Sequence, residues 1–297
     1  MFEEAQLYSP VTRGEEGVVV HLGADHPGAN DPVYRARRAE IAEAALDWTS
    51  GSPAPTIQYT EEEQNVWRTV CRELAPKYER YACRAFREAY AALGLPHDHI
   101  PQLEEVSARL EPLTGFGYVP AAGLVPLGEF YGSLADRVFH STQYIRHPAA
   151  PLYTPEPDLI HEVIGHGNLL ASPEFAELNL LAGQAARRCE TDPGLKFLAD
   201  VFWFTIEFGV MYEHGELRAY GAGILSSYGE IEEFRSMEIR PIDFLEMGTL
   251  DYDITKYQPV LYSAGSMTQL VDELGAFFAG FDDDTPGRLQ AEHSVSA

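Results

Sequence analysis

Apolar residues recur at helical spacing along much of the chain. The clearest stretch is residues 66–74, which follows a capping box at residues 60–63, where a Thr and a Glu can each bond the other's backbone. A second helix is predicted over residues 31–48, because an Asp and a Pro stand where a cap and a first turn need them. A third helix passes through residues 81–90, and Gly94 can end it.

Towards the C-terminus, helical patterns alternate with segments rich in Gly, Pro or Ser. Residues 130–145 and 196–213 are predicted helices, and Asp158 can cap a short helix over residues 161–166. Extended or looped structure is predicted for residues 115–126, 147–158 and 219–229. Short strands are predicted near residues 216–220 and 237–241. The expected fold class is mostly α, or α+β with small β strands, and no Gly-rich phosphate-binding pattern supports a nucleotide-binding fold.

Composition and charge narrow the classes of function. A formal net charge of −25 repels nucleic acid and anionic lipid headgroups, so no nucleic-acid or membrane partner is expected. The first ten residues lack the regions of a signal peptide, and no apolar run is long enough to span a membrane. Cys71, Cys83 and Cys189 form no C-x-x-C pair, which argues against a disulfide framework or a structural zinc site. A cytoplasmic location is therefore expected.

Two histidines within residues 161–166 (HEVIGH) suggest that both bind one metal ion. His161 and His166 are five residues apart, and on an ideal α-helix this spacing turns the second side chain about 140° from the first. Gly165 relieves the conflict, because glycine lets the helix end or loosen just before His166. The spacing alone leaves a structural pair of histidines as an open alternative.

A carboxylate in the apolar segment VFWFTIEFGV, residues 201–210, offers a third ligand. If Glu207 is buried, it must be paired, neutralised or bound to a cation, whereas a helix face in contact with solvent would require no partner. Two His and one carboxylate form the facial triad of non-haem Fe(II) oxygenases, which leaves positions open for oxygen. Arg146 is a candidate clamp for a carboxylate or an ordinary ion-pair partner, and Phe130 a candidate platform for a flat heterocycle or a core residue.

Longer motifs around these residues resemble the pterin-dependent aromatic amino acid hydroxylases. They are TQYIRH at 142–147, YTPEPD at 153–158, HEVIGH at 161–166, FWFTIEFG at 202–209 and LRAYGAGILSSYGE at 217–230. Three earlier motifs resemble the animal-type catalytic domain more than the shorter bacterial form: ADHPGANDPVYRARR at 24–38, YTEEEQNVW at 59–67 and IPQLEEVS at 100–107. The resemblance implies the mostly helical aromatic amino acid hydroxylase catalytic-domain fold, with a deep iron pocket.

The resemblance also implies the roles of individual residues. The iron ligands would be His161, His166 and Glu207, and Glu162 would be a catalytic residue that helps to position the pterin. Phe130 would stack on the tetrahydropterin, and the backbone of Gly123, Leu124 and Val125 would offer it hydrogen bonds. Arg146, Thr154 and Ser226 would bind the carboxylate of the amino acid. Its aromatic side chain would lie among His140, Pro155, Trp203, Phe208 and Gly223.

The implied reaction is the hydroxylation of L-phenylalanine to L-tyrosine with O₂, Fe(II) and a tetrahydropterin. The tryptophan-specific branch tends to carry Phe at the position of Trp203, and the tyrosine-specific branch tends to carry Asp at the position of Ile254. Ile254 would leave a substrate hydroxyl without a partner, which disfavours tyrosine. Phe208 and Gly223 resemble the pattern of enzymes that hydroxylate the para position.

The chain is expected to divide into three parts. Residues 1–23 would be an N-terminal extension, residues 24–281 the catalytic domain, and the polar residues 282–297 a disordered tail. Neither a regulatory domain nor the long heptad helix with which animal members tetramerise is recognisable, so a monomer or weak dimer is expected. Its partners would be small molecules, an aromatic amino acid and O₂.

A few positions depart from the family pattern. Gly167 and Asn168 follow the second histidine, where the family usually has an apolar residue and proline. Phe202 stands where many members have Tyr, and Gly117 and Tyr118 replace longer polar side chains near the pterin loop. These changes bear on pterin choice and on rate.

Three alternative functions remain open at this point. The first is another branch of the same family, a phenylalanine 3-hydroxylase or a tryptophan 5-hydroxylase of secondary metabolism. The second is a zinc hydrolase with Glu162 as its base, which the five-residue spacing of the histidines disfavours. The third is a non-catalytic binding protein that has kept the fold, which the intact His161, His166 and Glu207 disfavour.

Overall fold

Helices make up most of the computed structural model, which describes residues 9–15, 17–254 and 256–296. The longer helices are α2 (Pro32–Leu46), α3 (Glu61–Tyr81), α4 (Arg84–Leu93), α5 (Leu103–Thr114), α6 (Leu127–Leu134), α8 (Pro173–Ala186), α9 (Asp192–Phe202), α13 (Met267–Gly280) and α14 (Thr285–Ser296). The shorter ones are α7 (Asn168–Leu170), α10 (Ala222–Ser226), α11 (Glu230–Glu233), α12 (Phe244–Met247) and the 3₁₀ helix η3 (Phe234–Ser236). Two segments are π helices, η1 (His161–Gly167) and η2 (Trp203–Glu207).

Short strands form three small sheets within the described ranges. Strands β1 (Val11–Gly14) and β2 (Gly17–Val20) form an antiparallel hairpin, whereas β3 (Gly117–Pro120) and β4 (Val138–Ser141) are parallel. The largest sheet has the order β6-β5-β8-β7, with bounds Glu216–Ala219, Val210–Glu213, Val260–Ala264 and Glu238–Pro241. The prediction of a mostly helical fold with small strands is confirmed.

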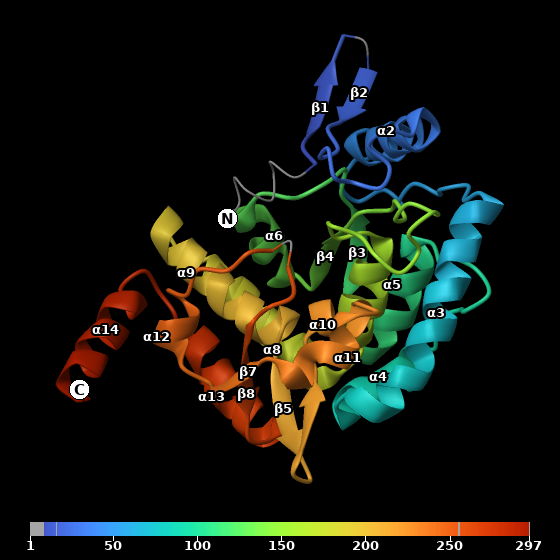
Figure 1. Cartoon of the computed structure of the whole chain (residues 1–297). Helices are drawn as coiled ribbons and strands as arrows, with labels where there is room; N and C mark the ends of the chain where they lie inside the picture. The colour runs from blue at the N-terminus through green and yellow to red at the C-terminus, as the bar shows by residue number, and fades with distance from the viewer. Residues whose placement is uncertain (1–8, 16, 255, 297) are drawn as a thin grey trace.

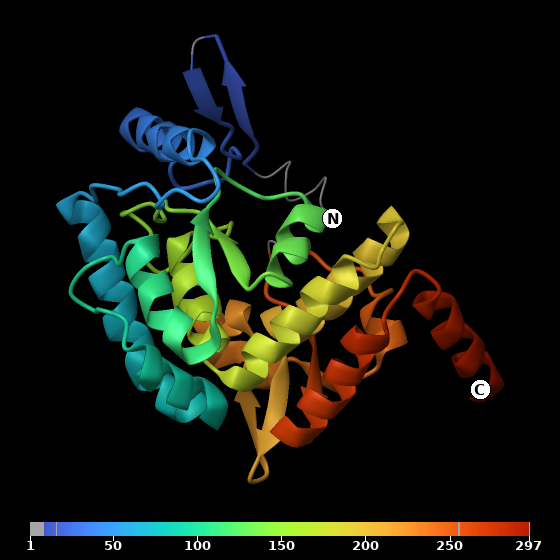
Figure 2. The same ribbon diagram turned by 180° about the vertical axis from the view of Figure 1, so that it is seen from behind.

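The arrangement places the π helices among the long helices. Figure 1 shows the β1–β2 hairpin and α2 at one end of the molecule and strand β5 at the other. Helix α8 packs against both α6 and α13, as Figure 2 shows from behind, while α10 packs directly on η1. Large apolar side chains such as Trp67, Phe175 and Tyr220 are fully buried between these elements. No helix within the described part of the chain is both long enough and apolar enough to cross a bilayer.

The helix ends agree with the capping signals in the sequence. Thr60 accepts a hydrogen bond from the backbone of Glu63, whose side chain accepts one from the backbone of Thr60, so the capping box forms. Asp31 caps α2 through the backbone N–H groups of its first turn. Gly94 ends α4 in the left-handed region, at φ 57°, which glycine adopts without steric cost.

Four predicted segments differ from the structure. Residues 130–145 are not one helix, because α6 ends at Leu134 and the next residues pair with β3 as strand β4. The helix predicted over 196–213 ends at Glu207, and pairing with β6 and β8 makes its last residues strand β5. The segment 219–229 contains α10. Tertiary pairing and packing override local propensity in these places.

The fourth correction concerns the C-terminus, where the sequence predicted a disordered tail over residues 282–297. Residues 285–296 form helix α14. Arg288 forms an ion pair with Asp282 at 2.9 Å, and the helix packs against α9 and α12. Contacts with the rest of the fold therefore stabilise a segment whose composition alone indicated disorder.

Candidate active site

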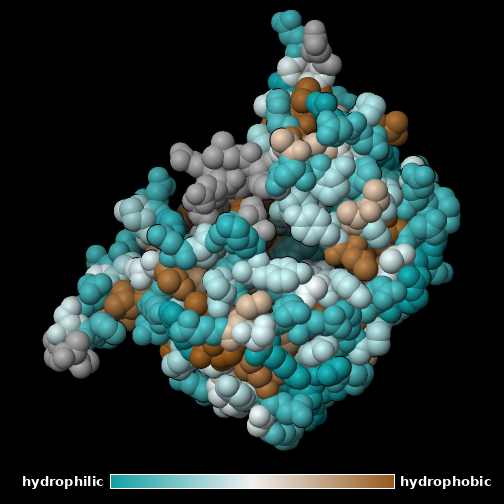
Figure 3. Space-filling view, in the orientation of Figure 1, coloured by the Kyte–Doolittle hydropathy of each residue, from teal (hydrophilic) through white to brown (hydrophobic). Residues whose placement is uncertain are grey.

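A cavity of about 330 Å³ collects the site residues that the sequence indicated. Each residue to which the resemblance gave a role lines this cavity, although the residues come from segments far apart in the chain. Figure 3 shows a recess near the centre of the molecular face. Because the walls come from η1, η2, α6, α10 and the loops between them, the tertiary fold and not local sequence assembles the site.

The π geometry of η1 explains the spacing of the two histidines. In a π helix the backbone bonds join residues five apart, so His161 and His166 lie one turn apart on the same face. The sequence left open whether the helix ends or loosens at Gly165, and in the structure it continues in the wider π form to Gly167. A Cβ atom on Gly165 would lie 2.9 Å from the backbone oxygen of Ala222, so the glycine lets α10 pack closely on η1.

Two residues that depart from the family pattern hold η1 in this form. The hydroxyl of Tyr118 donates a hydrogen bond to the backbone oxygen of Glu162 at 2.8 Å. The side-chain amide of Asn168 donates to the backbone oxygen of Ile164 at 2.7 Å. Both carbonyls belong to η1, so each of these side chains adds a hydrogen bond to the π segment.

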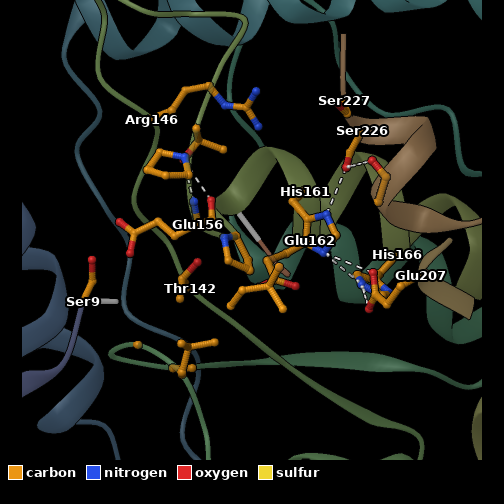
Figure 4. A pocket seen from close by; sticks show the side chains of 18 of the residues that line it. Ser9, Thr142, Arg146, Glu156, His161, Glu162, His166, Glu207, Ser226 and Ser227 are labelled. Atoms are coloured by element: carbon orange, nitrogen blue, oxygen red, sulfur yellow. Dashed lines mark hydrogen bonds and ion pairs between the residues drawn. The ribbon is translucent and has the colours of Figure 1, made fainter. Parts of the chain in front are cut away.

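Three potential ligand atoms converge where η1 faces η2, as Figure 4 shows. The Nε2 atom of His166 lies 2.8 Å from Oε1 of Glu207 and 3.1 Å from Nε2 of His161. The Nε2 atom of His161 lies 3.6 Å from Oε2 of Glu207. Its other ring nitrogen, Nδ1, lies 2.9 Å from the hydroxyl oxygen of Ser226, and this contact fixes the orientation of the ring.

The donor set suits a divalent metal ion. Burial lowers the pKa of His161 to about 4, so its imidazole is neutral near pH 7 and has a lone pair available. Burial opposes ionisation of Glu207, but the neighbouring histidines outweigh it and lower the pKa of that carboxyl. Two imidazole nitrogens and a carboxylate oxygen in close contact form the two-His-one-carboxylate arrangement of non-haem iron sites.

A second carboxylate lies near the same histidines. Glu162 offers an oxygen within 4.8 Å of the ligand nitrogens of His161 and His166. Glu207 fits a third ligand position better, because its oxygens lie 2.8 Å and 3.6 Å from the two Nε2 atoms. Burial, together with the charges of Glu207 and Asp158, raises the pKa of Glu162 well above its usual value.

Aromatic side chains form the wall beside the candidate metal ligands. The rings of Trp203 and Phe208 lie 4.5 Å apart, and Trp203 stacks on Tyr252 at 4.8 Å. The indole N–H of Trp203 donates to the side-chain oxygen of Gln258 at 3.3 Å. A Cβ atom on Gly223 would lie 2.6 Å from Cζ of Phe208, so the glycine creates the space that the Phe208 ring occupies.

The structure gives Arg146 a partner that the sequence analysis did not assign. Its Nε and Nη2 atoms donate to the two carboxylate oxygens of Asp158 at 2.9 Å and 2.8 Å, and both side chains are buried. Among the described residues no partner contacts Nη1, and Arg146 lines the cavity. The hydroxyl of Thr154 donates to the backbone oxygen of Glu156 at 2.8 Å. The sequence analysis named Asp158 only as a helix cap, so its ion pair with Arg146 was not predicted.

The opposite wall contains the residues expected to meet the pterin. Phe130 in α6 is partly buried, and its ring contacts Phe139 edge to face at 5.4 Å. Phe139 in turn lies 4.8 Å from the ring of His166, so a platform of aromatic rings leads to the candidate metal ligands.

The loop of Gly123, Leu124 and Val125 precedes α6 and lines the cavity. His140 in β4 also reaches it, with Nδ1 3.1 Å from the hydroxyl oxygen of Ser133.

Two buried carboxylates of the cavity were not singled out from the sequence. Oε1 of Glu156 lies 2.6 Å from Nη1 of Arg38 and 3.5 Å from Nε2 of His26. Glu230 is also buried, and its Oε1 accepts a hydrogen bond from the backbone N–H of Gln258 at 3.1 Å. Glu156 and Glu230 lie inside motifs that resemble the family, TPEPD and SSYGE. Acidic residues usually face solvent, so nothing in the sequence indicates that these two are buried.

Comparisons with known proteins agree with this site. Residues 16–285 match the family model described as biopterin-dependent aromatic amino acid hydroxylase. The chain is 48% identical over 264 residues to a phenylalanine 3-hydroxylase of Streptomyces coeruleorubidus, covering 89% of this chain and 95% of that protein. It is 42% identical to the phenylalanine-4-hydroxylase of Rattus norvegicus, covering 87% of this chain but 58% of the rat protein. The chain thus spans somewhat more than half the length of the rat enzyme.

Solved structures show the same fold. A phenylalanine hydroxylase from Colwellia psychrerythraea 34H has a TM-score of 0.73 and 32% identity, covering 84% of this chain and 95% of that one. A Chromobacterium violaceum phenylalanine hydroxylase, whose structure has bound iron(III) and 7,8-dihydrobiopterin, has a TM-score of 0.73 and 28% identity over 80% of this chain and 90% of that one. The predicted fold family and the predicted dependence on iron and a pterin are confirmed. This chain belongs to the biopterin-dependent aromatic amino acid hydroxylases.

Proposed function

We propose that this enzyme hydroxylates L-phenylalanine to L-tyrosine, using O₂, Fe(II) and a tetrahydropterin. The observation that carries the substrate assignment is the composition of the aromatic wall. Trp203 and Phe208 pack against each other beside the metal ligands, and Ile254 lines the same cavity without a polar group. A bare phenyl ring fits such a wall, whereas the hydroxyl of tyrosine would be buried without a partner from Ile254.

His161, His166 and Glu207 would hold the iron. When bound, Fe(II) and the reduced pterin supply the reducing power that activates O₂ for transfer of one oxygen atom to the substrate ring. The protein contributes geometry: Ser226 orients His161, and three protein ligands leave positions open on the metal. The apolar wall excludes water from the side of the ring that reacts.

The pterin would stack on Phe130 and receive backbone hydrogen bonds from the loop of Gly123, Leu124 and Val125. Support comes from the position of Phe130, which continues an aromatic platform through Phe139 to His166. Glu162 lines the same cavity, within 4.8 Å of the ligand nitrogens of His161 and His166, and would help to position the pterin. Stacking on an aromatic ring and backbone donors suit a flat heterocycle with several polar edges.

The amino acid carboxylate would bind the free Nη1 of Arg146. Asp158 holds the guanidinium through its other two nitrogens, so the group is fixed in place and needs little ordering on binding. Thr154 and Ser226 would complete this end of the site. Their hydroxyls already contact the Glu156 backbone and His161, so their share of the carboxylate contact would be smaller than that of Arg146.

The position of hydroxylation has a second candidate. The 48% identity to a phenylalanine 3-hydroxylase favours the meta position for this chain as well. The pairing of Phe208 with Gly223 supports the para position, because the ring fills the space that a Gly223 side chain would need and thereby shapes the wall next to the substrate ring. Tryptophan 5-hydroxylation is disfavoured by Trp203, a bulky residue where the tryptophan-specific branch tends to carry Phe.

A product assay tests the proposal. Purified protein with Fe(II), tetrahydropterin and O₂ receives phenylalanine, tyrosine and tryptophan in parallel, and chromatography against standards identifies the products. We expect para-tyrosine from phenylalanine. Meta-tyrosine as the main product would refute the proposed regiochemistry, and 5-hydroxytryptophan as the main product would refute the proposed substrate. The cytoplasmic location and the monomeric or weakly dimeric state remain predictions, and sedimentation of the purified protein tests the second.

A further inference from the structure

Glu230, the first residue of α11, places a buried carboxylate at the cavity. Its side chain lines the cavity although the residue is only 7% exposed. Oε1 accepts one hydrogen bond, from the backbone N–H of Gln258. The other oxygen has no hydrogen-bond partner among the described residues, and it is not sealed away from the cavity. One lone carboxylate oxygen is thus available to a ligand.

The Arg and Lys side chains that line the cavity already have partners. Arg146 forms a bidentate pair with Asp158, and Arg38 lies 2.6 Å from Glu156. Lys256 also lines the cavity, but its ammonium is mostly exposed and lies 2.9 Å from Asp253. No cationic side chain in the described ranges lies within 4 Å of the Glu230 carboxylate.

A buried carboxylate without a counter-charge is costly, because burial removes water that stabilises the ion. Burial raises the pKa of Glu230 to about 7, although the hydrogen bond from Gln258 opposes this. A cation that binds beside such a carboxylate stabilises its ionised form. The cavity therefore has a place for a positively charged group of the ligand.

The proposed substrate carries such a group. An aromatic amino acid is a zwitterion, with the ammonium and the carboxylate on the same carbon, so both must find partners when the ring enters the pocket. Arg146 would take the carboxylate. Glu230 and Ser226 both line the cavity. Ser226 ends α10 and contacts His161, and Glu230 begins the next helix, four residues later.

We propose that Glu230 binds the α-ammonium group of the amino acid substrate through the oxygen that Gln258 does not occupy. This inference rests on the proposed function insofar as the substrate is an amino acid. The contact is a charge-assisted hydrogen bond in a site of low solvent exposure, where such bonds are strongest. It makes the enzyme select amino acids over aromatic acids that have no amino group.

A purely structural role would also explain the Gln258 contact. Gln258 accepts the indole N–H of Trp203, so Glu230 could merely hold the loop that supports the aromatic wall. The two roles predict different results for Glu230→Gln, because glutamine keeps an oxygen that can accept from the Gln258 backbone but removes the negative charge. Loss of the loop contact would affect every aromatic ligand, whereas loss of the charge would affect those with an ammonium group.

The experiment compares L-phenylalanine with 3-phenylpropionate, the same molecule without the amino group. Binding of both to the iron-loaded parent and to Glu230→Gln is measured by calorimetry, without reduced pterin so that no turnover occurs. We expect the dissociation constant of L-phenylalanine to rise about 10- to 100-fold in the variant. That of 3-phenylpropionate should stay within about twofold of the parent value or fall, since its binding has no ammonium to lose. The KM for L-phenylalanine should rise in parallel, with a much smaller change in kcat.

Equal weakening of both ligands would overturn the proposal in favour of a structural role, and unchanged binding of L-phenylalanine would overturn it outright. Glu233→Gln is the matched control, because Glu233 is on the same helix but exposed, and it should leave both constants unchanged. If the parent proves to hydroxylate tryptophan, the same comparison uses tryptophan and indole-3-propionate. The substrate assignment would then fail, while the role of Glu230 would be decided separately by the variant.

Discussion

Glu156 and Glu230 are two buried carboxylates in the wall of one cavity, and their surroundings differ sharply. Glu156 lies beside Arg38 of α2, at 2.6 Å, and beside the imidazole of His26, at 3.5 Å. The Glu230 carboxylate accepts one hydrogen bond from a backbone N–H, and no cationic side chain of the described residues lies within 4 Å of it. Burial opposes ionisation of both groups. For Glu156 the His26 hydrogen bond and the Arg38 charge outweigh it and lower the pKa to about 2, whereas the pKa of Glu230 rises to about 7.

This difference separates a structural carboxylate from one available to a ligand. The pair of Arg38 and Glu156 is complete in the protein itself, and the guanidinium also lies 3.3 Å from the centroid of the Tyr144 ring. Glu230 lacks the charge that would complete it. A buried charge that the fold leaves unpaired identifies a place where the ligand supplies the partner.

The largest expected effect concerns a third carboxylate, Glu207, whose partner would be the metal. Glu207→Ala should abolish iron binding and turnover, because it removes one of three ligands. Iron content after dialysis, measured by atomic absorption, and product formation test this. Glu233→Ala is the control for loss of a carboxylate elsewhere. An active variant that retains iron would contradict the ligand assignment.

Breaking the complete pair should destabilise the fold. Glu156→Gln leaves the buried Arg38 without its counter-charge, which should lower the free energy of unfolding by about 3–5 kcal/mol. Urea denaturation followed by circular dichroism measures the change. Glu230→Gln provides the comparison, because it removes a charge without a cationic partner and should not destabilise the protein at pH 7. Equal destabilisation by the two substitutions would contradict the distinction drawn between these carboxylates.

The two carboxylates should also change stability in opposite directions with pH. The folded-state pKa of Glu156 is below its unfolded value of 4.5, so its stabilisation is present above pH 4.5 and is lost as the pH falls towards 2. The folded-state pKa of Glu230 is above 4.5, so the protein loses stability as the pH rises from 4.5 through 7. Each effect should approach about 3 kcal/mol at its limit.

Unfolding free energies of ligand-free parent, Glu156→Gln and Glu230→Gln across this pH range measure both effects. The advantage of Glu230→Gln over the parent should grow between pH 5 and pH 8, as burial of the ionised carboxylate becomes more costly in the parent. The advantage of the parent over Glu156→Gln should shrink below pH 4.5. A constant difference for either variant would contradict the pKa shift on which it is based.

The smallest expected effect concerns the other side of the cavity. Tyr118→Phe removes the hydrogen bond to the Glu162 backbone in η1, which should cost about 1–2 kcal/mol of stability. Because η1 carries two of the proposed metal ligands, iron affinity should fall modestly as well. Thermal unfolding and competition with an iron chelator measure these changes. Tyr212→Phe is a suitable control, since Tyr212 is exposed in β5. An unchanged iron affinity would show that Tyr118 does not help to hold the π helix.

From the sequence, the residues of the site were predicted more accurately than the local secondary structure. His161, His166 and Glu207 were named from residue type, spacing and resemblance, and the structure brings them within hydrogen-bond range of one another or close to it. Residues 161–166 form the short helix that the sequence predicted, but its π form was not predicted, because π geometry is too rare to expect from a short pattern even though i,i+5 spacing fits it. Strands β4 and β5 were missed because their partners are distant in sequence.

The amino-acid sequence by itself determined the family, the fold class and the helix caps, since these depend on residue identity at short spacing. Only the tertiary structure decided which charges are buried together. The sequence left Arg146 as a candidate carboxylate clamp or an ordinary ion-pair partner, and in the structure it is paired with Asp158. Glu230 was one more acidic residue in the sequence, but it is buried at the cavity with no cationic side chain within 4 Å among the described residues. Burial and pairing between distant segments set the state of a carboxylate, and neither is written in the residues next to it.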